Sequence, residues 1–226
     1  MVQPSVNAGA MIVPIILAAG ESSRMGRLKA LCDFDGRTCL ELALDACREA
    51  LLASPIVVLG FREGIIRQLV PFGDANVVVN ESAERGRTSS LKAGLRAIPD
   101  RAEAFLLYPI DFPLVSAAEV RLLAAAWRTR SASERIFIPS HDRRRGHPVL
   151  FDATLRDAFV ELADDAPART VVDTYRDRVA YVACDTPNVL IDMDTPDDYV
   201  RCLLAFRARA IATGSAGTPV PAGVPS

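Results

Sequence analysis

Residues 12–31 of this chain read IVPIILAAGESSRMGRLKAL. The run at its start is apolar and rich in β-branched side chains, which predicts a β-strand buried on both faces. The strand ends in the small residues 18–20, and the loop that follows carries Arg24, Arg27 and Lys29. Small residues allow a ligand to approach the backbone, whose free amide groups can bind an anion. The stretch therefore predicts an anion-binding loop at the end of a buried strand.

The spacing of the glycines separates this loop from two common phosphate-binding loops. It lacks the GxGxxG pattern of dinucleotide-binding proteins. Five residues separate Gly20 from Gly26, and Arg27 stands where a Walker A loop has Lys. From the charges alone, a solvent-exposed basic turn is an equally good interpretation of the loop.

Further apolar runs follow at intervals that predict more strands, and helical patterns separate them. The runs cover residues 12–19, 56–60, 76–79, 104–110, 135–139, 148–151 and 178–183, and 188–193 is a further candidate. Alternation of strands and helices favours a mostly parallel sheet with helices on both faces, a three-layer α/β/α domain. Ligands of such sheets bind beyond the carboxyl ends of the strands.

Three helix starts are marked by side chains that cap the first turn. Thr38 and Ser116 are each followed three positions later by Glu, the capping-box pattern, and Thr195 precedes Pro at the first helical position. A weaker helical pattern carries Leu91 and Leu95. Gly94 lies inside it, where close contact with the first strand or simple packing would each explain a glycine.

Composition limits the class of protein and its surroundings. Half of the 226 residues are apolar, and 26 basic against 28 acidic residues give a net charge of −2, so no bulk attraction to nucleic acid or to a membrane is expected. No apolar run approaches the roughly 20 residues that span a bilayer. The five cysteines form no metal-ligand spacing, and reduced core thiols of a cytoplasmic protein are expected. We expect one domain over residues 11–211, between a mobile tail at 1–10 and a disordered tail at 212–226.

Carboxylates follow two of the later apolar runs. Asp111 comes after the run at 104–110, and Asp192 and Asp194 precede the helix that begins after Thr195. Mg²⁺ prefers one or two carboxylates together with phosphate oxygens and water. Taken alone, Asp111 and Asp194 are better explained as turn or capping residues. Asp192 lies on the same face of an extended segment as Asp194 and is a candidate second ligand.

The string LAAGESSRMGRLKAL resembles the LA(A/G)GxSxRMGxxK signature of the NTP transferase family of the MobA-like, molybdenum cofactor cytidylyltransferase type. The resemblance extends over about residues 11–200 and implies a single Rossmann-like nucleotidyltransferase domain with a mostly parallel, mixed sheet. It implies Arg24, Lys29 and Asp111 as catalytic residues, and Asp111 and Asp194 as ligands of Mg²⁺. The chain departs from the family pattern at Ile110, where Gly is usual, and in the acidic element that reads TPDD.

Two further loops are implied to bind the substrates. The nucleotide would be bound by Leu17, Ala18, Ala19, Gly20, Glu21, Arg24, Lys29, Asn80, Ser89, Ser90 and Asp111. In the family the segment around Ser90 closes over the base. The run HDRRRGHPVLF resembles a segment on the acceptor side, which implies acceptor binding by Arg145, Gly146 and His147. An isolated basic run is otherwise usually a solvated loop.

The resemblance implies transfer of a nucleotide from an NTP to a small phosphorylated acceptor, with release of pyrophosphate. CTP as donor and a molybdopterin-like acceptor are favoured. With only His141 and His147 present, the chain offers no obvious nucleophile–His–acid set. A phosphate acceptor needs none, because its second pKa is near 6. A sugar- or polyol-phosphate acceptor, and a nucleotide-sensing protein without turnover, remain alternatives, and the oligomeric state is not readable.

Overall fold

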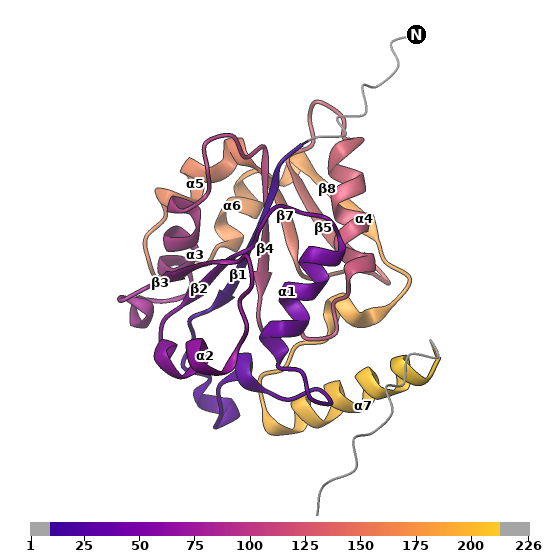
Figure 1. The fold of residues 1–226 in the computed structure, drawn as a ribbon. Helices are drawn as coiled ribbons and strands as arrows, with labels where there is room; N and C mark the ends of the chain where they lie inside the picture. The colour runs from indigo at the N-terminus through magenta and orange to yellow at the C-terminus, as the bar shows by residue number, and fades with distance from the viewer. Residues whose placement is uncertain (1–9, 213–226) are drawn as a thin grey trace, which may run out of the picture.

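The computed structural model describes residues 10–212 of the chain (Figure 1). A single sheet runs through the middle of the described part, with helices on both of its faces and across one end. Its strands are β1 (Ile12–Ala18), β2 (Ile56–Leu59), β3 (Asn76–Val79), β4 (Ala104–Pro109), β5 (Ile136–His141), β6 (Arg144–Arg145), β7 (Val149–Asp152) and β8 (Val179–Ala183). All seven firmly expected strands are present, and the three-layer α/β/α prediction is confirmed.

The sheet has the order β3-β2-β1-β4-β7-β5-β6, and β8 pairs with the other side of β5. Strands β1 to β4 are mutually parallel, β7 runs antiparallel to β4 and β5, and β8 is parallel to β5. The sheet is therefore mixed and mostly parallel, as expected. The carboxyl ends of β1, β2 and β4 lie together at one edge of it.

The α-helices are α1 (Cys39–Glu49), α2 (Glu63–Leu69), α3 (Arg87–Arg96), α4 (Ala117–Arg128), α5 (Arg156–Val160), α6 (Arg169–Thr174) and α7 (Pro196–Ala212). Both expected capping boxes form, at Thr38 and at Ser116. At the start of α7, Thr195 and Asp198 exchange the hydrogen bonds of a third box. The capping residues therefore identified these helix starts correctly.

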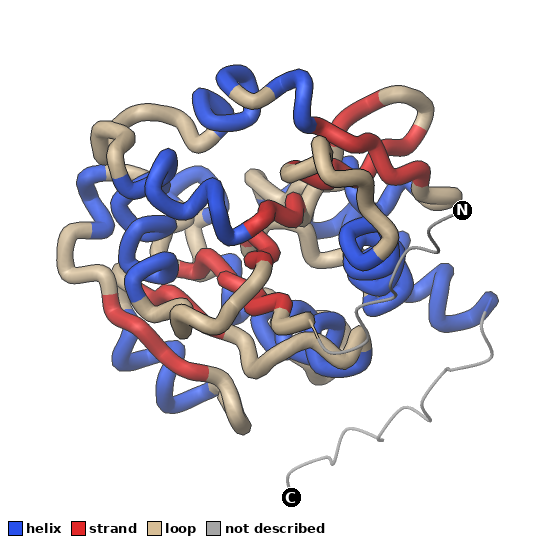
Figure 2. Tube along the Cα trace, turned by 90° about the horizontal axis from the view of Figure 1, so that it is seen from above, coloured by secondary structure: helices blue, strands red, loops and turns tan. Residues whose placement is uncertain are grey.

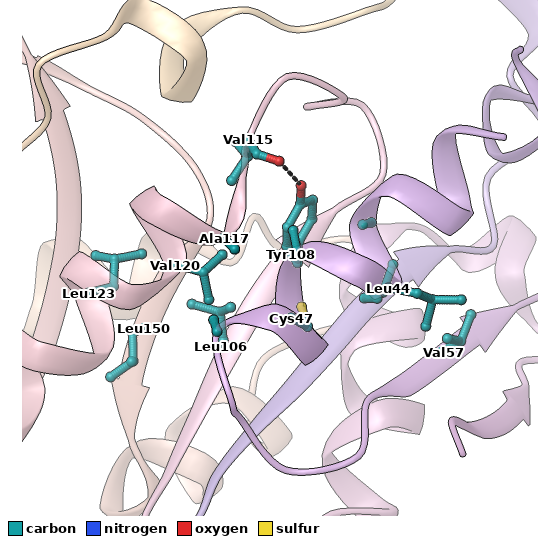
Figure 3. Close-up of a cluster of buried hydrophobic side chains, with 14 of the residues drawn as sticks. Leu44, Cys47, Val57, Leu106, Tyr108, Val115, Ala117, Val120, Leu123 and Leu150 are labelled. Carbon is teal, nitrogen blue, oxygen red and sulfur yellow. Dashed lines mark hydrogen bonds between the residues drawn. The ribbon is translucent and has the colours of Figure 1, made fainter. Parts of the chain in front are cut away.

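Alternation along β1 divides the core into two layers. Ile12 and Ile16 point into the layer under α1 and α4, whereas Val13 and Ile15 point into the layer under α3 and α5. Figure 3 shows the first layer, in which side chains such as Leu106 fill the space between sheet and helices. The buried Tyr108 hydroxyl donates to the Val115 carbonyl at 3.4 Å in that layer.

Helix α7 crosses the edge of the sheet where the parallel strands end, and it packs on a third cluster (Figure 1). This cluster contains Cys32, Phe34, Cys39 and Met193, which lie behind the loop after β1. Figure 2, seen from above, shows the helices on both sides of the sheet. No described helix between residues 10 and 212 is long and apolar enough to cross a membrane.

Several expectations need adjustment. Residues 188–193 form no strand, because 3-10 helix η6 (Pro187–Leu190) turns the chain and buries Val189. Helix α7 continues to Ala212, one residue into the predicted tail. Ala10, the last residue of the other predicted tail, packs against the core. The remaining residues of both predicted tails, 1–9 and 213–226, lie outside the described part of the chain.

Candidate active site

The loop after β1 folds back through two short 3-10 helices, η1 (Ser23–Met25) and η2 (Lys29–Leu31). Gly26 separates them with a φ of 68°, a conformation that favours glycine. The Lys29 amide donates to Ser22 Oγ at 3.2 Å, which fixes the start of η2. As a result the Lys29 side chain is largely buried and points its ammonium group at the ends of β4 and of the segment before α7.

Three cations and two carboxylates meet at this point. Lys29 Nζ donates to Asp194 Oδ1 and lies 3.9 Å from Asp111 Oδ2. Arg24 Nη2 lies 2.7 Å from Asp194 Oδ2, and Arg87 Nη2 lies 3.5 Å from Asp111 Oδ2. Residues from four separate parts of the sequence therefore form one charged cluster, as expected for Arg24, Lys29, Asp111 and Asp194.

Backbone contacts hold the two carboxylates in place. The Met193 amide donates to the Asp111 carbonyl at 2.8 Å, so the segment before α7 lies against the end of β4. The Met193 side chain is buried in the third core cluster. The Asp194 amide donates to Asp198 Oδ2 at 3.1 Å, which ties Asp194 to the first turn of α7. The position of Asp194 thus follows from a capped helix start.

Burial and neighbouring charges determine the pKa of Asp194 and leave one oxygen of Asp111 without a partner. The hydrogen bond from Lys29 lowers the pKa of Asp194; burial opposes this, and the charges of Lys29, Arg24 and Arg87 add to it, so the carboxylate is ionised at neutral pH. Asp111 is 7% exposed, and its Oδ1 has no hydrogen-bond partner. An orphaned buried carboxylate oxygen is costly unless a ligand or ion satisfies it.

The carboxylates fit the expected divalent cation. Asp111 and Asp194 share Lys29 as a neighbour, which places both at one point, and Mg²⁺ needs only one or two protein carboxylates. Among the described residues no group of three or more His, Cys, Asp and Glu could hold a metal ion by itself. Asp192 is exposed, and its charge acts on the pKa of His147.

A cavity of about 700 Å³ opens beside the charged cluster. Of the predicted site residues, its lining includes Leu17, Ala18, Ala19, Gly20, Glu21, Arg24, Lys29, Ser90, Asp111, His147 and Asp194. The loop after β1 therefore lines the same space as the carboxylates. Such a volume is in the range of small-molecule sites.

Asn80 and Ser89 lie outside that lining and connect the loop before α3 to the first turn of that helix. Asn80 Nδ2 donates to Ser89 Oγ at 2.9 Å and to Ser90 Oγ at 3.0 Å. Ser89 Oγ in turn donates to the Gly86 carbonyl at 2.8 Å. The two side chains shape the loop and thereby place Ser90, which does line the cavity.

The three predicted acceptor residues separate in space. His147 lines the cavity, and its ring centroid lies 4.7 Å from that of Phe112. Burial lowers the pKa of His147, so the imidazole is neutral at pH 7, and its Nδ1 is buried without a partner. Gly146 is required for packing, because a Cβ there would lie 2.4 Å from the Val189 carbonyl oxygen. Arg145 is outside the cavity lining, with its guanidinium 5.4 Å from the centroid of the exposed Tyr181 ring.

Some cavity residues were not predicted from the sequence. Arg87 was not among the predicted site residues, yet its Nη2 lies 3.5 Å from Asp111 Oδ2. Residues 165–169, together with Thr88 and Phe112, also line the cavity. Residues 165–169 follow no strand of the nucleotide half and carry no recognised motif, so no local signal marked them.

Comparisons with known proteins agree with this geometry. The family model of the MobA-like NTP transferase domain matches residues 14–179. The chain is 30% identical over 197 residues to nicotine blue oxidoreductase of Paenarthrobacter nicotinovorans, over 85% of this chain and 96% of that protein. It is 24% identical over 190 residues to molybdenum cofactor cytidylyltransferase of Escherichia coli, over 82% of this chain and 92% of that protein.

Solved structures show the same fold. Rv0371c of Mycobacterium tuberculosis superimposes with a TM-score of 0.78 and 31% identity, over 86% of this chain and 98% of that chain. A second structure of that protein, a complex with manganese, has a TM-score of 0.74 and 28% identity, over 87% and 100% of the two chains.

The fold, the basic loop after β1 and the paired carboxylates define a nucleotidyltransferase. Within that class, the chain belongs to the MobA-like NTP transferase family.

Proposed function

We propose that this protein transfers CMP from CTP to a small phosphorylated acceptor in the presence of Mg²⁺, with a molybdopterin-like compound as the acceptor. The main support is that Lys29 contacts both Asp111 and Asp194, and that these residues line the same cavity as residues 17–21. The relative that is a molybdenum cofactor cytidylyltransferase supports this choice of substrates. Reduced, buried thiols and the use of CTP both suit a cytoplasmic enzyme.

In this proposal the chain acts by charge and position. The backbone of residues 17–21 holds the base and ribose, and Ser90 contacts the base edge. When the nucleotide binds, Lys29 and Arg24 leave their ion pairs with Asp194 and form charge-assisted hydrogen bonds to the triphosphate. An oxygen of the acceptor phosphate attacks the α-phosphorus, the bond to the β-phosphate oxygen breaks, and pyrophosphate leaves. No base is needed, because the acceptor phosphate is ionised at neutral pH.

Asp111 and Asp194 are the residues that would hold Mg²⁺, which when bound supplies neutralisation of phosphate charge. In this proposal His147, which lines the cavity beside Phe112, binds the acceptor. Because its imidazole is neutral, it contributes a hydrogen bond to the acceptor without adding charge.

The direct test is a pyrophosphate-release assay in which each NTP is paired with a panel of acceptors. The panel should contain molybdopterin, sugar phosphates and polyol phosphates. We expect turnover with CTP and molybdopterin that depends on Mg²⁺. Turnover only with a sugar or polyol phosphate would keep the chemistry and change the acceptor. Tight NTP binding with no pyrophosphate release from any pair would leave a nucleotide-sensing protein.

The similarity to nicotine blue oxidoreductase gives a second candidate, because that relative is matched over nearly its full length. A redox enzyme on this fold would use the cavity for a dinucleotide cofactor and would transfer hydride to a planar acceptor. Hydride transfer has no evident use for the paired carboxyl groups of Asp111 and Asp194 beside Lys29. Oxidation of NADH or NADPH with a quinone-like dye, without any requirement for divalent cation, would favour this candidate over nucleotidyl transfer.

A further inference from the structure

One wall of the cavity comes from the 162–169 segment, which connects α5 to α6 and then leads to β8. Residues 165–169 line the cavity, and their charged members are one carboxylate, Asp165, and one cation, Arg169. The guanidinium of Arg169 is mostly exposed and its Nε lies 3.2 Å from Asp173 Oδ2. Because surface ion pairs of this kind are weak, the guanidinium is available to an anion in the cavity.

The segment is held from α3 by a buried ammonium group. Lys92 is 8% exposed, and a buried charge must be paired and hydrogen-bonded. Its Nζ donates to the Leu162 carbonyl and to Asp164 Oδ1, the latter at 2.9 Å. Both partners belong to the segment, so Lys92 ties the wall to α3.

Three further contacts come from the first turn of α3 and the residues before it. Arg85 Nη1 lies 3.3 Å from Asp164 Oδ2, and Thr88 Oγ1 donates to the Ala166 carbonyl. Gly86 has a φ of 119°, and a Cβ at that position would lie 3.1 Å from the Asp164 carbonyl oxygen. The wall and the loop that carries Arg87 toward Asp111 therefore form one unit.

The wall adjoins both halves of the cavity. The nucleotide residues 17–21 follow β1, whereas His147 and the 162–169 segment precede and follow β7, on the opposite side of β4. The segment is also tied to α3, the helix that carries Ser90. Arg87 stands between the two halves, 3.5 Å from Asp111.

We propose that residues 165–169 bind the anionic group of the second substrate through Arg169, and that Lys92 is the positioning residue that holds them there. This proposal rests on the proposed function, because it assigns a place to a phosphorylated acceptor. It adds a subsite to the predicted acceptor residues and offers Arg169 as its cation where Arg145 is outside the cavity lining.

The test compares full-length Lys92→Met, Lys92→Arg and Arg169→Met with Arg101→Met, which removes an exposed cation outside the cavity. Amide hydrogen exchange is followed across residues 162–169, without ligand and with millimolar inorganic phosphate as the anion probe. Affinity for CTP with Mg²⁺ is measured by calorimetry. The KM and kcat for molybdopterin are measured by pyrophosphate release.

Lys92→Met should speed exchange in residues 162–169, remove protection by phosphate and raise the acceptor KM about tenfold or more, with CTP affinity unchanged. Lys92→Arg should restore protection, because the charge and its hydrogen bonds are kept. Arg169→Met should lose phosphate protection and raise the acceptor KM while exchange without ligand stays normal, and this variant decides the matter if Lys92→Met does not fold. Arg101→Met should match the wild type.

Unchanged exchange at residues 162–169 in a folded Lys92→Met protein would overturn the positioning role. Persistent phosphate protection in Arg169→Met would overturn the subsite, and so would an equal loss of CTP affinity and acceptor KM. If the wild type releases no pyrophosphate, the proposed function fails. The exchange measurements with phosphate then still decide whether Lys92 and Arg169 build an anion subsite.

Discussion

Lys29 lies within 4 Å of both carboxylates of the site, and its loss should affect nucleotide binding directly. Charge-assisted hydrogen bonds contribute about 1.5–3 kcal/mol, so Lys29→Ala should lower CTP affinity about 10- to 150-fold and slow turnover as well. Calorimetry with CTP and Mg²⁺ measures the first effect. Arg27→Ala is the matched control, because Arg27 lies in the same loop but stacks on Tyr199 and is absent from the cavity lining. Equal affinities for CTP in Lys29→Ala and wild type would remove Lys29 from the phosphate site.

Asp111 presents a carboxylate oxygen that no protein group satisfies. Asp111→Asn should therefore fold normally, because it keeps the volume and breaks only long ion pairs of 3.5 and 3.9 Å. We expect turnover to fall about 100-fold or more, the order of loss found when a preorganised charged or polar group is removed. Pyrophosphate release across a Mg²⁺ titration and a thermal melt measure the two properties. The exposed Asp157→Asn on α5 serves as control, and an Asp111→Asn enzyme with wild-type Mg²⁺-dependent turnover would contradict the metal-site assignment.

At the scale of residues, the sequence was informative wherever a motif ran continuously along the chain. The loop after β1 and the Asp that follow strands could be assigned because each stands at a strand end or helix start. Arg87 and residues 165–169 could not, since only long-range pairs such as Lys92 with Asp164 bring them to the cavity. Arg145 was expected in the site because it belongs to a continuous motif. Its guanidinium instead lies over the Tyr181 ring, outside the cavity lining.

Helix α4 begins at a capping box whose acid also joins a distant segment. Glu119 accepts from the Ser116 hydroxyl and amide, and from Thr186 Oγ1 at 2.8 Å. Burial acts to raise the pKa of Glu119, but these hydrogen bonds outweigh it and hold the pKa below its ordinary value of 4.5. The ionised form therefore stabilises the fold above about pH 4.5, and this stability is lost as the pH falls through the native pKa.

Glu119→Gln should accordingly lower the free energy of unfolding by about 1–3 kcal/mol at pH 7, since hydrogen bonds to a charged group are replaced by weaker ones. The difference from wild type should shrink as the pH falls below 4.5. Urea unfolding at a series of pH values measures it. A difference that stays constant from pH 7 to pH 3 would show that the charge of Glu119 does not stabilise the fold.

Helix α3 approaches β1 so closely that a side chain at Gly94 has no room. A Cβ there would lie 2.5 Å from Ile15 Cγ2 and 3.0 Å from Val58 Cγ2. Alanine is favoured in a helix by about 1 kcal/mol, but overpacking costs about 1–3 kcal/mol, so Gly94→Ala should destabilise the protein. Gly64→Ala in α2, which has open space at the Cβ, should instead be neutral or stabilising. If urea unfolding ranks the two variants the other way, the contact between α3 and β1 is looser than described.

Elements with a strong pattern were predicted, and short ones were missed. The long apolar runs and the two Glu-containing capping boxes identified the strands and α1 and α4 because burial and capping act locally. Helices α5 and α6 are short and are stabilised by packing on α3 and the second core layer, which no local pattern records. The run 188–193 resembled a strand because it is apolar. In the structure, η6 buries Val189 without pairing to a strand of the sheet.

Across the whole molecule, all five cysteines are buried free thiols. Burial raises the pKa of Cys32 to about 11, that of Cys202 to about 11 and that of Cys47 to about 12. Since the thiolate is the reactive form, the native protein should react very slowly with a thiol reagent such as DTNB at pH 8. The same reagent should titrate five thiols in guanidinium chloride. A fast-reacting thiol in the native protein would show that part of the core around α1 or α7 opens readily.

The overall architecture was predictable because alternation of strand and helix patterns restricts the topology to a parallel sheet with helices on both faces. What the patterns did not specify was the strand that reverses. Strand β7 has the same apolar character as its neighbours β4 and β5, to which it is antiparallel, and its direction follows from the short connection through β6 and Gly146. The halves of the cavity are consequently built by different parts of the chain.

This division has a consequence for synthesis on the ribosome. Strands β3, β2, β1 and β4 are contiguous in the sheet and are all contained in residues 12–109, so they can pair before the second half of the chain has emerged. The free edge of β4 then stays open until Val149–Asp152 is translated. During that interval β4 is an unprotected edge of hydrophobic strand in the nascent chain, and it is the place where contact with a second nascent copy or with a chaperone would occur.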